Sequence, residues 1–560
     1  MAKDYSKLEK KDLIKVIEKL ESRKRYGLIW DEEKVKEQFE KDAQNALPVL
    51  KEIKSKEIID KNGGPINILI EGDNYHALSV LNFTHQGKVD IIYIDPPYNT
   101  GSKTWKYNND YIDKNDTWKH SKWLSFMKNR LALAKNLLTQ DGSLICAVDE
   151  NEHATLGLLL EEIFPDKEIV CVTVIHNPGG IQGNNFSYCH EYAYFVFPQG
   201  GTYISNVKRD GDKPTPLRDW GGEESKRDTA KNCFYPIFTK EGKIIGFGDV
   251  CKDNFHPSAS NIKKKDGVME IYPIDSSGVE RKWRFARQSI EEIKDELACE
   301  LIRDEWTVRR YKQNYRWKTV WTDEKYNANV YGTQLLSQII KIKFPYPKSL
   351  YTVEDCIRAI IHNKNNAIVL DYFAGSGTTA HAVLELNKED QGNRTFILCT
   401  NNEGNICEEV CYPRVTNIIK GYKNLKNGKP VIGLGGNLKY FKTKFVKNAS
   451  NKDDFKIRIT KECTEMLCLR EGIFDEIKKT NDYRIFQQGN KILAVYYSLD
   501  HKALNDLKKE LNKIDKEKVL YCFTLDPLGL NKNDFIGWQK IKLESIPQKI
   551  LDVYKQIYEY

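Results

Sequence analysis

The sequence predicts an α/β protein with a doubly wound, mostly parallel sheet that is interrupted by an inserted domain. Short apolar runs of strand length, over 66–70, 89–94 and 143–148, alternate with helix-like segments. Such alternation is typical of βαβ units. It stops between about residues 177 and 344, where Gly, Asn, Arg and Trp are frequent, and it returns from residue 367. The two regular stretches are therefore expected to form one sheet.

The individual elements follow from the same pattern. Helical spacing of apolar residues over 6–23, followed by a charged helical stretch over 31–45, predicts a helical N-terminal segment. After the irregular region, 367–370 and 395–400 have strand character and 378–387 has helical character. We expect an N-terminal segment over 1–60, two halves of the α/β domain over 61–175 and 346–437, an insertion over 176–345, and an α+β C-terminal domain over 438–560.

Composition narrows the class of protein. Charged residues make up 30% of the 560 residues, and no apolar run approaches the roughly 20 residues that a membrane span needs. The N-terminus lacks the pattern of a secretory signal, so we expect a cytoplasmic protein. The thirteen cysteines form no C-x-x-C pair, which favours reduced thiols and no metal site. A net charge of +8 is compatible with a polyanionic partner.

The first chemical motif, Asp95-Pro96-Pro97-Tyr98, directly follows the predicted strand over 89–94. Ligands of open α/β sheets bind at the carboxyl ends of the strands. Two prolines stiffen a turn and remove backbone donors, while its carbonyls can still accept. A carboxylate and a carbonyl can accept both hydrogens of an exocyclic amine while an aromatic ring stacks on the base. The alternative is that the prolines only end the strand and Tyr98 covers the core.

The second motif, Asp371-Tyr372-Phe373-Ala374-Gly375-Ser376-Gly377, joins a predicted strand to a predicted helix. Gly375 and Gly377 allow a tight turn and a close approach of a ligand to the backbone. The glycines also fit a dinucleotide fingerprint, but Asp371 would crowd a pyrophosphate, whereas it suits the ammonium of a methionine moiety. A phosphate-binding loop is excluded because Thr378 stands where a lysine is needed.

Together the two motifs resemble the amino-methyltransferases that act on DNA, in the order of the β class. Further blocks resemble the modification subunits of type III restriction systems, and the resemblance covers about residues 25 to 445. These blocks are 25–30, 71–74, 148–152, 318–321 and 344–348. The resemblance implies a doubly wound, Rossmann-like S-adenosylmethionine-dependent methyltransferase sheet, with an inserted target-recognition domain.

The resemblance also assigns roles to residues. Asp95 and Pro96, with Pro97 shaping the turn, would hold the target amine, and Tyr98 would stack on the flipped base. The cofactor pocket would comprise Asp73, Asp95, Lys348, Asp371, Phe373, Gly375, Gly377 and Glu403. Two positions depart from the family pattern, because Asn401-Asn402 precedes Glu403 and Ser349 replaces the usual proline after Lys348. The register of Glu403 and the shape of the loop at Lys348 are therefore less defined.

Basic and aromatic residues alternate in the insertion over 301–321, as expected for phosphate contacts and base stacking. The alternative is a charged surface over a small aromatic core. The candidate DNA contacts here and in the Gly-rich loop before it are Arg218, Arg227, Arg309, Arg310, Arg316 and Lys318. A lysine-rich stretch over 414–447 suits contacts to phosphates without sequence preference.

The resemblance implies a site-specific enzyme that methylates the N6 amine of adenine in double-stranded DNA, without a metal. It also implies a homodimer that can bind a helicase-nuclease restriction subunit. Cytosine N4 methylation remains the nearest alternative, although its motif more often begins with Ser. A DNA-binding specificity subunit without catalysis is a third, against which the intact Asp95 and Gly375 argue. Ring-carbon methylation is disfavoured because no Pro-Cys nucleophile is present.

Overall fold

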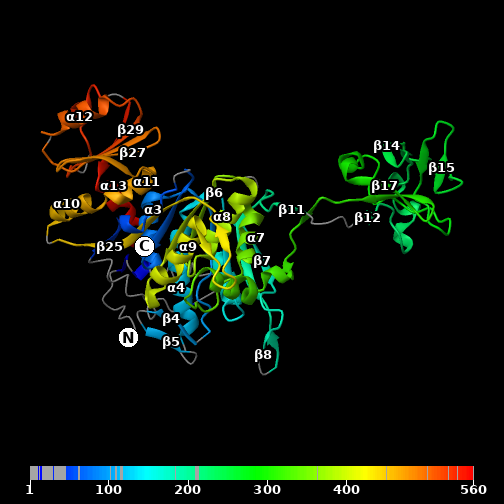
Figure 1. Ribbon diagram of the computed structural model, residues 1–560, viewed down its shortest axis with the longest axis horizontal. Helices are drawn as coiled ribbons and strands as arrows, with labels where there is room; N and C mark the ends of the chain where they lie inside the picture. The colour runs from blue at the N-terminus through cyan, green and yellow to red at the C-terminus, as the bar shows by residue number, and fades with distance from the viewer. Residues whose placement is uncertain are drawn as a thin grey trace. The chain divides into compact units, whose positions relative to one another are not determined.

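The computed structural model divides into two compact units, residues 1–204 with 318–560, and residues 205–317. Figure 1 shows the chain from its N-terminus to its C-terminus. The described residues are 10–11, 13–15, 30, 46–60, 63–100, 102–107, 110–113, 118–182, 185–208, 214–361, 364–449, 451–500, 502–526, 529–538 and 540–558. The helices expected over 6–23 and 31–45 lie almost entirely outside them.

A ten-stranded sheet forms the centre of the first unit. Its strand order is β1 (Ala46–Glu52), β25 (Asn437–Lys447), β2 (Ile66–Glu71), β22 (Thr395–Thr400), β21 (Ile368–Asp371), β3 (Val89–Ile94), β6 (Leu138–Val148), β10 (Glu191–Pro198), β7 (Lys167–Val174) and β20 (Val320–Trp321). From β25 to β6 all neighbours are parallel, while β1 and β10 are antiparallel to their neighbours. The five expected strands and the mostly parallel sheet are therefore confirmed.

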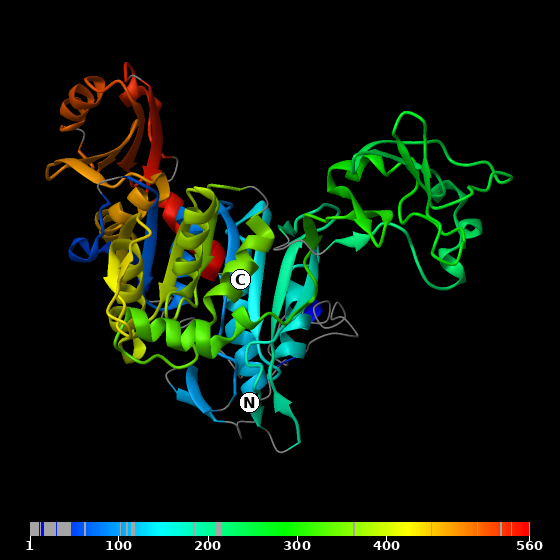
Figure 2. The same ribbon diagram turned by 45° about the vertical axis from the view of Figure 1, so that its right-hand side comes forward.

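Helices cover both faces of this sheet (Figures 1 and 2). One group is α3 (Asn74–Thr84), α4 (Lys119–Lys135) and α5 (His153–Ile163), and the other is α7 (Leu350–Ile361), α8 (Thr378–Asp390) and α9 (Tyr412–Lys420). Asp73 begins α3 by accepting a hydrogen bond from the Tyr75 N–H at 2.8 Å, which satisfies a donor that the first turn leaves open. The expected helix over 378–387 is confirmed as α8.

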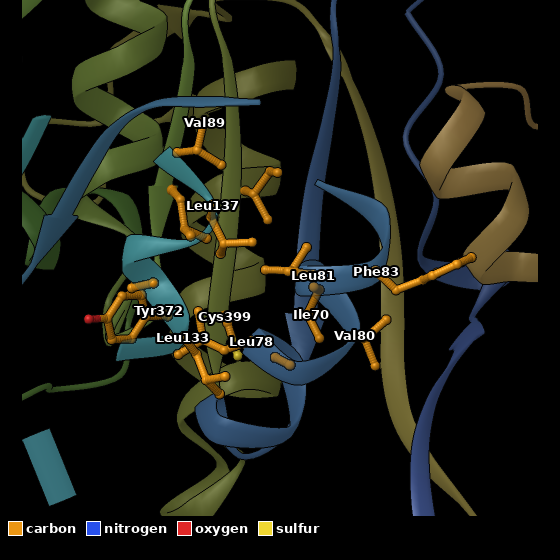
Figure 3. Packing of buried hydrophobic residues seen from close by; sticks show 14 of the residues in the cluster. Ile70, Leu78, Val80, Leu81, Phe83, Val89, Leu133, Leu137, Tyr372 and Cys399 are labelled. Carbon is orange, nitrogen blue, oxygen red and sulfur yellow. The ribbon is translucent and has the colours of Figure 1, made fainter. Parts of the chain in front are cut away.

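The hydrophobic core lies where α3 and α4 pack on the sheet. Figure 3 shows Leu78 and Leu81 of α3 beside Ile70 of β2 and Cys399 of β22, with Leu133 of α4 nearby. All five side chains are buried. Nine of the eleven residues of α3 are buried, so this helix is enclosed on most of its sides. The carboxyl ends of the central strands are thereby held in fixed register.

Two segments of the first unit differ from the expected domain boundaries. β10 lies in the expected insertion, yet it pairs with β6 and β7 in the central sheet. β25 lies beyond the expected end of the α/β domain, yet it pairs with β2. Their sheet membership depends on pairing with distant strands, which local apolar pattern does not reveal.

The C-terminal part of the first unit has its own sheet. Its strands are β26 (Asp475–Lys479), β27 (Tyr483–Gln488), β28 (Lys491–Tyr496), β29 (Glu517–Phe523) and β30 (Ile541–Ile546), in that order. The helices here are α10 (Lys452–Glu462), α11 (Thr464–Glu471), α12 (Leu504–Asn512) and α13 (Gln548–Tyr558). Because α11 and α13 contact α3, this part shares the core of the central sheet.

The second unit is built from small antiparallel sheets around a core that contains Tyr235, Ile237 and Trp283. Its strands are β11 (Asn206–Lys208), β12 (Thr215–Pro216), β13 (Ile237–Lys240), β14 (Lys243–Phe247), β15 (Asn261–Lys263), β16 (Met269–Ile271), β17 (Leu297–Ile302), β18 (Glu305–Arg310) and β19 (Asn314–Arg316). The insertion is thus a separate compact unit, but it spans 205–317 rather than all of 176–345.

Candidate functional site

The residues predicted for the site follow four adjacent parallel strands. Asp73 follows β2, Glu403 follows β22, Asp371 ends β21 and Asp95 follows β3. The strand order β2-β22-β21-β3 is continuous, so these four carboxyl ends lie on one edge of the sheet. Strand order along the chain reverses between β21 and β3, and ligands of open α/β sheets bind at such a reversal. The structure therefore brings both motifs to a single edge.

The Asp95 turn is anchored on both sides. The Pro97 carbonyl accepts a hydrogen bond from Trp123 Nε1 of α4 at 2.7 Å. Asn99, which is buried and has a φ of 56°, donates to Glu152 at 2.5 Å. Glu152 also contacts His120 Nδ1 at 2.7 Å. These contacts fix the backbone of the turn, so the positions of Asp95 and Tyr98 are defined before any ligand binds.

Lys348 lies directly against this turn. Its Nζ is 3.4 Å from Asp95 Oδ1, contacts Glu191 Oε2 and the Tyr98 hydroxyl, and lies 4.6 Å from the centre of the Tyr98 ring. Lys348 was expected on the cofactor side, through the resemblance. The structure places it in contact with both residues that were expected to hold the base.

Glu191 is a site residue that the sequence interpretation did not include. It begins β10, is 3% exposed, and accepts a hydrogen bond from the Tyr98 hydroxyl at 3.3 Å. The signal was present in the sequence, since Glu191 is the one ionisable residue in the run Glu191-Tyr-Ala-Tyr-Phe-Val-Phe197 apart from its tyrosines. A buried carboxylate in an apolar strand requires a charged or hydrogen-bonding partner.

The charged groups of the cluster shift one another's pKa values. Burial raises the pKa of Asp95, an effect that the Lys348 ammonium opposes and the Glu191 carboxylate reinforces. Burial would also raise the pKa of Glu191, but Lys348 holds that pKa below its ordinary value. Although burial opposes it, the two carboxylates raise the pKa of Lys348. Glu191 and Lys348 therefore stay charged, while Asp95 is the group that can more readily take a proton.

The glycine turn joins β21 to α8. Gly375 and Gly377 have φ values of 47° and 78°, a conformation that favours glycine. A Cβ at Gly377 would lie 3.2 Å from Cys411 Sγ, so the turn is also closely packed. Phe373 is half-buried, and its ring centre is 5.8 Å from that of Phe126 on α4. The turn thus combines a tight backbone with an aromatic wall.

Asp371 is engaged within its own turn. It is buried and accepts hydrogen bonds from the Phe373 N–H at 2.9 Å and the Thr379 hydroxyl at 2.5 Å. Burial raises its pKa to about 7, with these hydrogen bonds opposing the shift and Asp95 adding to it. These contacts give Asp371 a part in shaping the turn, in place of the open carboxylate expected for a ligand ammonium.

Asp73 and Glu403 lie at the outer part of the same edge. The Asp73 side chain is 44% exposed and lies 3.6 Å from the buried Arg130 guanidinium. Glu403 is exposed and begins the short helical turn Glu403–Asn405 after β22. Both carboxylates can therefore be reached by a ligand. Among the described residues, no group of three or more His, Cys, Asp or Glu side chains is arranged to hold a metal ion.

The arginines predicted to contact DNA differ in their surroundings within the second unit. Arg227 is buried, donates to Glu280 at 2.9 Å and to the Phe255 carbonyl at 2.8 Å, and so supports the fold. Arg218 is half-buried and donates to the Ile274 carbonyl. Arg309 pairs with Glu300 and Arg310 with Glu296, at 3.3 and 2.5 Å. By contrast, Arg316 of β19 is exposed, as is Lys318 in the first unit.

None of the helices that the structure describes has both the length and the apolar character required to cross a membrane. All thirteen cysteines are free thiols.

Comparisons with known proteins identify the family of the chain. A family model described as DNA methylase matches residues 89–410. The type III restriction-modification enzyme EcoPI Mod subunit of Escherichia phage P1 is 28% identical, over 63% of this chain and 60% of that protein. The type II methyltransferase M.KpnI of Klebsiella pneumoniae is 29% identical, over 63% and 84%. The probable HindVI Mod subunit of Haemophilus influenzae is 39% identical, over 58% and 48%. The chain thus aligns with about 60% of the EcoPI Mod subunit.

Proposed function

Because the chain belongs to the N6/N4 DNA methylase family, we propose that it transfers a methyl group from S-adenosylmethionine to the N6 amine of a flipped adenine in double-stranded DNA. The observation that carries this proposal is the position of Asp95 and Tyr98 at the end of β3, beside the glycine turn at the end of β21. A base amine held by Asp95 would face a ligand held by that turn. Adenine is favoured over cytosine because the motif begins with Asp.

The residues at the sheet edge suit S-adenosylmethionine. This molecule carries an ammonium group, two ribose hydroxyls and a flat adenine ring, and it supplies an electrophilic methyl group on a sulfonium. Asp73 and Glu403 offer accessible carboxylates for the polar groups. The Phe373 ring offers an apolar wall, and Gly375 and Gly377 let the ligand approach the backbone. Asp371 would hold the turn in shape.

The chain's own residues would act on the amine by position and charge. The lone pair of an exocyclic nitrogen is conjugated with the base, so the amine is a poor nucleophile. Hydrogen bonds from its two protons to the Asp95 carboxylate and the Pro96 carbonyl favour a more tetrahedral nitrogen. Fixed alignment with the methyl group supplies much of the remaining rate enhancement. Flipping the base costs a few kcal/mol, part of which stacking on Tyr98 offsets.

We further propose that the chain is the modification subunit of a type III restriction-modification system. It would methylate alone, as a homodimer, and would bind a separate restriction subunit. The similarity to Mod subunits supports this assignment. Arg316 and Lys318 are the exposed members of the predicted DNA contacts, whereas Arg227 is left out because its guanidinium is engaged inside the second unit.

The test is methylation of unmodified genomic DNA by the purified chain with S-adenosylmethionine, followed by sequencing that reports modified bases. We expect N6-methyladenine within one short sequence context. N4-methylcytosine would favour the alternative target base. No transferred methyl group, together with no heat of S-adenosylmethionine binding in calorimetry, would indicate a DNA-binding subunit without catalysis.

A further inference from the structure

Three segments that are distant in sequence meet around the Lys348 ammonium. Asp95 follows β3, Glu191 begins β10, and Lys348 precedes α7. Lys348 and Glu191 are only 9% and 3% exposed, while 26% of the Asp95 side chain is exposed. Thus the pair of Lys348 and Glu191 lies behind Asp95, and the Asp95 carboxylate is the part of the cluster open to a ligand.

The cluster contains two carboxylates and one ammonium. Lys348 Nζ contacts Glu191 Oε2 more closely than Asp95 Oδ1, from which it is 3.4 Å away. When all three groups are charged, their net charge is −1. If Glu191 were absent, Asp95 would be the one carboxylate among the described residues within 4.0 Å of the Lys348 ammonium.

We propose that Glu191 is a positioning residue, which holds the Lys348 ammonium so that the Asp95 carboxylate remains free to accept the target amine. This inference rests on the proposed function and adds a residue to its site. Glu191 also fixes Tyr98, because the Tyr98 hydroxyl donates to Glu191 at 3.3 Å. A single buried carboxylate thereby sets both the charge beside Asp95 and the position of the ring expected to stack on the base.

The net charge of the cluster matches the charge change of the reaction. The lone pair of the amine nitrogen forms the new bond to carbon, and the electron pair of the broken carbon–sulfur bond stays on sulfur. Positive charge thus appears on the nitrogen, next to the Asp95 carboxylate. One N–H proton then passes to Asp95, which leaves a neutral methylated amine and a cluster of net charge zero. Fixed charges that favour the developing charge lower the barrier.

Asp95 can take this proton because its surroundings disfavour its charge. Besides Lys348 and Glu191, the described titratable groups that face it or influence its cluster include Tyr93 of β3, Tyr98, Cys146 of β6, Asp149 after β6, His176 after β7, Cys356 of α7 and Asp371 of β21. Burial raises the pKa of Asp95, whereas Lys348 keeps Glu191 ionised by lowering its pKa. The two carboxylates therefore have different tasks.

The pH profile of methyl transfer tests this division of tasks. Single-turnover rates would be measured from about pH 5 to about pH 9, with the acid limb reporting Asp95. Glu191→Gln removes the like charge beside Asp95, and the Lys348 ammonium then pairs with Asp95. The pKa of Asp95 should fall, so the acid limb should move to lower pH, and the plateau rate should fall about tenfold or more. Lys348→Met removes the opposite charge, so the acid limb should move to higher pH.

Two further variants separate charge from structure. Glu191→Asp keeps the charge, so its acid limb should stay closer to that of the wild type than the limb of Glu191→Gln. The double variant Glu191→Gln/Lys348→Met removes the like charge and the opposite charge beside Asp95 together, so its acid limb should lie between those of the single variants. Asp515→Asn removes a surface pair with Lys540 in the C-terminal part and serves as the matched control, with an unchanged profile.

A second readout needs no methyl donor. Fluorescence anisotropy would measure binding to a duplex whose target adenine is mispaired, so that flipping costs less. Glu191→Gln should weaken this binding severalfold, because the Lys348 ammonium then pairs with the Asp95 carboxylate that would otherwise accept from the target amine. Replacing the target adenine by purine, which has no exocyclic amine, should remove the difference between variant and wild type.

The outcomes distinguish this inference from the proposed function. If the wild type transfers no methyl group, the proposed function fails, and the inference fails with it. If the wild type is active but Glu191→Gln and Lys348→Met move the acid limb in the same direction, or not at all, only the inference is overturned. A Glu191→Gln defect that is equally large on purine DNA would also overturn it.

Discussion

Within one turn, the Asp95 carboxylate and the Tyr98 ring are expected to serve different steps. Asp95→Ala removes an acceptor needed during transfer, so methylation should fall close to background while S-adenosylmethionine still binds. Tyr98→Ala loses stacking worth about 1 to 3 kcal/mol, or about fivefold to 150-fold in the flipping equilibrium. Tyr98→Phe loses the contact with Glu191. It keeps the ring that is expected to stack on the base, so it should retain much of the activity. Initial rates on a fixed DNA duplex measure all three.

A mispaired target base provides the control for this prediction. A mispaired adenine is already partly unstacked, so the Tyr98→Ala defect should shrink on such DNA. Asp95→Ala should gain nothing, because its missing contact is needed after the base arrives. Equal rescue of both variants would contradict this division between flipping and transfer.

Asp371 gives a prediction about pH and stability. Its pKa is raised by burial from 3.8 to about 7, so the folded protein binds more protons than the unfolded chain between these values. Protonation of Asp371 therefore adds to the free energy of unfolding. This contribution is fully present below pH 3.8 and is lost as the pH rises to about 7. Each unit of pKa difference corresponds to about 1.4 kcal/mol. Asp371→Asn should flatten this part of the stability curve, as measured by denaturant unfolding at several pH values.

The Thr379 hydroxyl supplies a control for Asp371. It donates to Asp371 Oδ2 and opposes the upward shift of the pKa. Thr379→Val should therefore raise the pKa of Asp371 further and extend the loss of stability to higher pH. A variant Asp371→Asn with an unchanged pH dependence would show that other groups control it.

At the scale of single elements, β18 and β19 present arginines in different ways. Arg316 of β19 is exposed, whereas Arg310 of β18 pairs with Glu296 and lies 4.8 Å from the Phe285 ring. If Arg316 contacts a phosphate, Arg316→Ala should weaken DNA binding and reduce the slope of log affinity against log salt by about one. Titrations at several salt concentrations measure this slope.

Arg310→Ala is the matched control on β18, which precedes β19 in the sequence of the second unit. It removes the same charge but breaks a pair with Glu296. Arg310→Ala should therefore lower the melting temperature of this unit and change the salt slope less than Arg316→Ala does. A larger slope change in Arg310→Ala than in Arg316→Ala would reverse this assignment of the two arginines.

Elements whose identity depends on local pattern could be predicted from the sequence. The apolar runs that became β3, β21 and β22 carry enough buried side chains to define strands, and α8 follows a glycine turn. β10 was not assigned to the central sheet because its pairing with β6 and β7 is formed by distant residues. Glu191 was missed with it, since a carboxylate gains its role only when Lys348 and Tyr98 are brought beside it.

The predicted DNA contacts show the limit of composition as a guide. Arg227 and Arg316 are both basic residues in irregular sequence, yet one is buried and the other is exposed. The difference comes from Glu280 and the Phe234 ring, which lie against the Arg227 guanidinium. Because such partners are contributed by other parts of the unit, only the folded structure separates a supporting arginine from an accessible one.

At the scale of the whole molecule, the second unit is connected in a way that permits its removal. It has its own core around Trp283, and Asn206 of β11 pairs with Arg316 of β19. Opposite residues of an antiparallel pair have Cα atoms about 5 Å apart, so a short Gly/Ser linker can join the flanking chain ends. A variant in which a linker replaces 206–316 should therefore keep the first unit folded.

This variant should separate cofactor binding from DNA recognition. S-adenosylmethionine affinity in calorimetry should stay within about twofold of the wild type, since the sheet edge with Asp73, Phe373 and Glu403 belongs entirely to the first unit. Affinity for DNA containing the target sequence should fall toward that for unrelated DNA, because the exposed Arg316 and the rest of the second unit are gone. Preserved sequence-specific methylation would show that the first unit reads the target. If the variant lost cofactor binding while the unfolding transition of the first unit stayed unchanged, the second unit would be needed for cofactor binding.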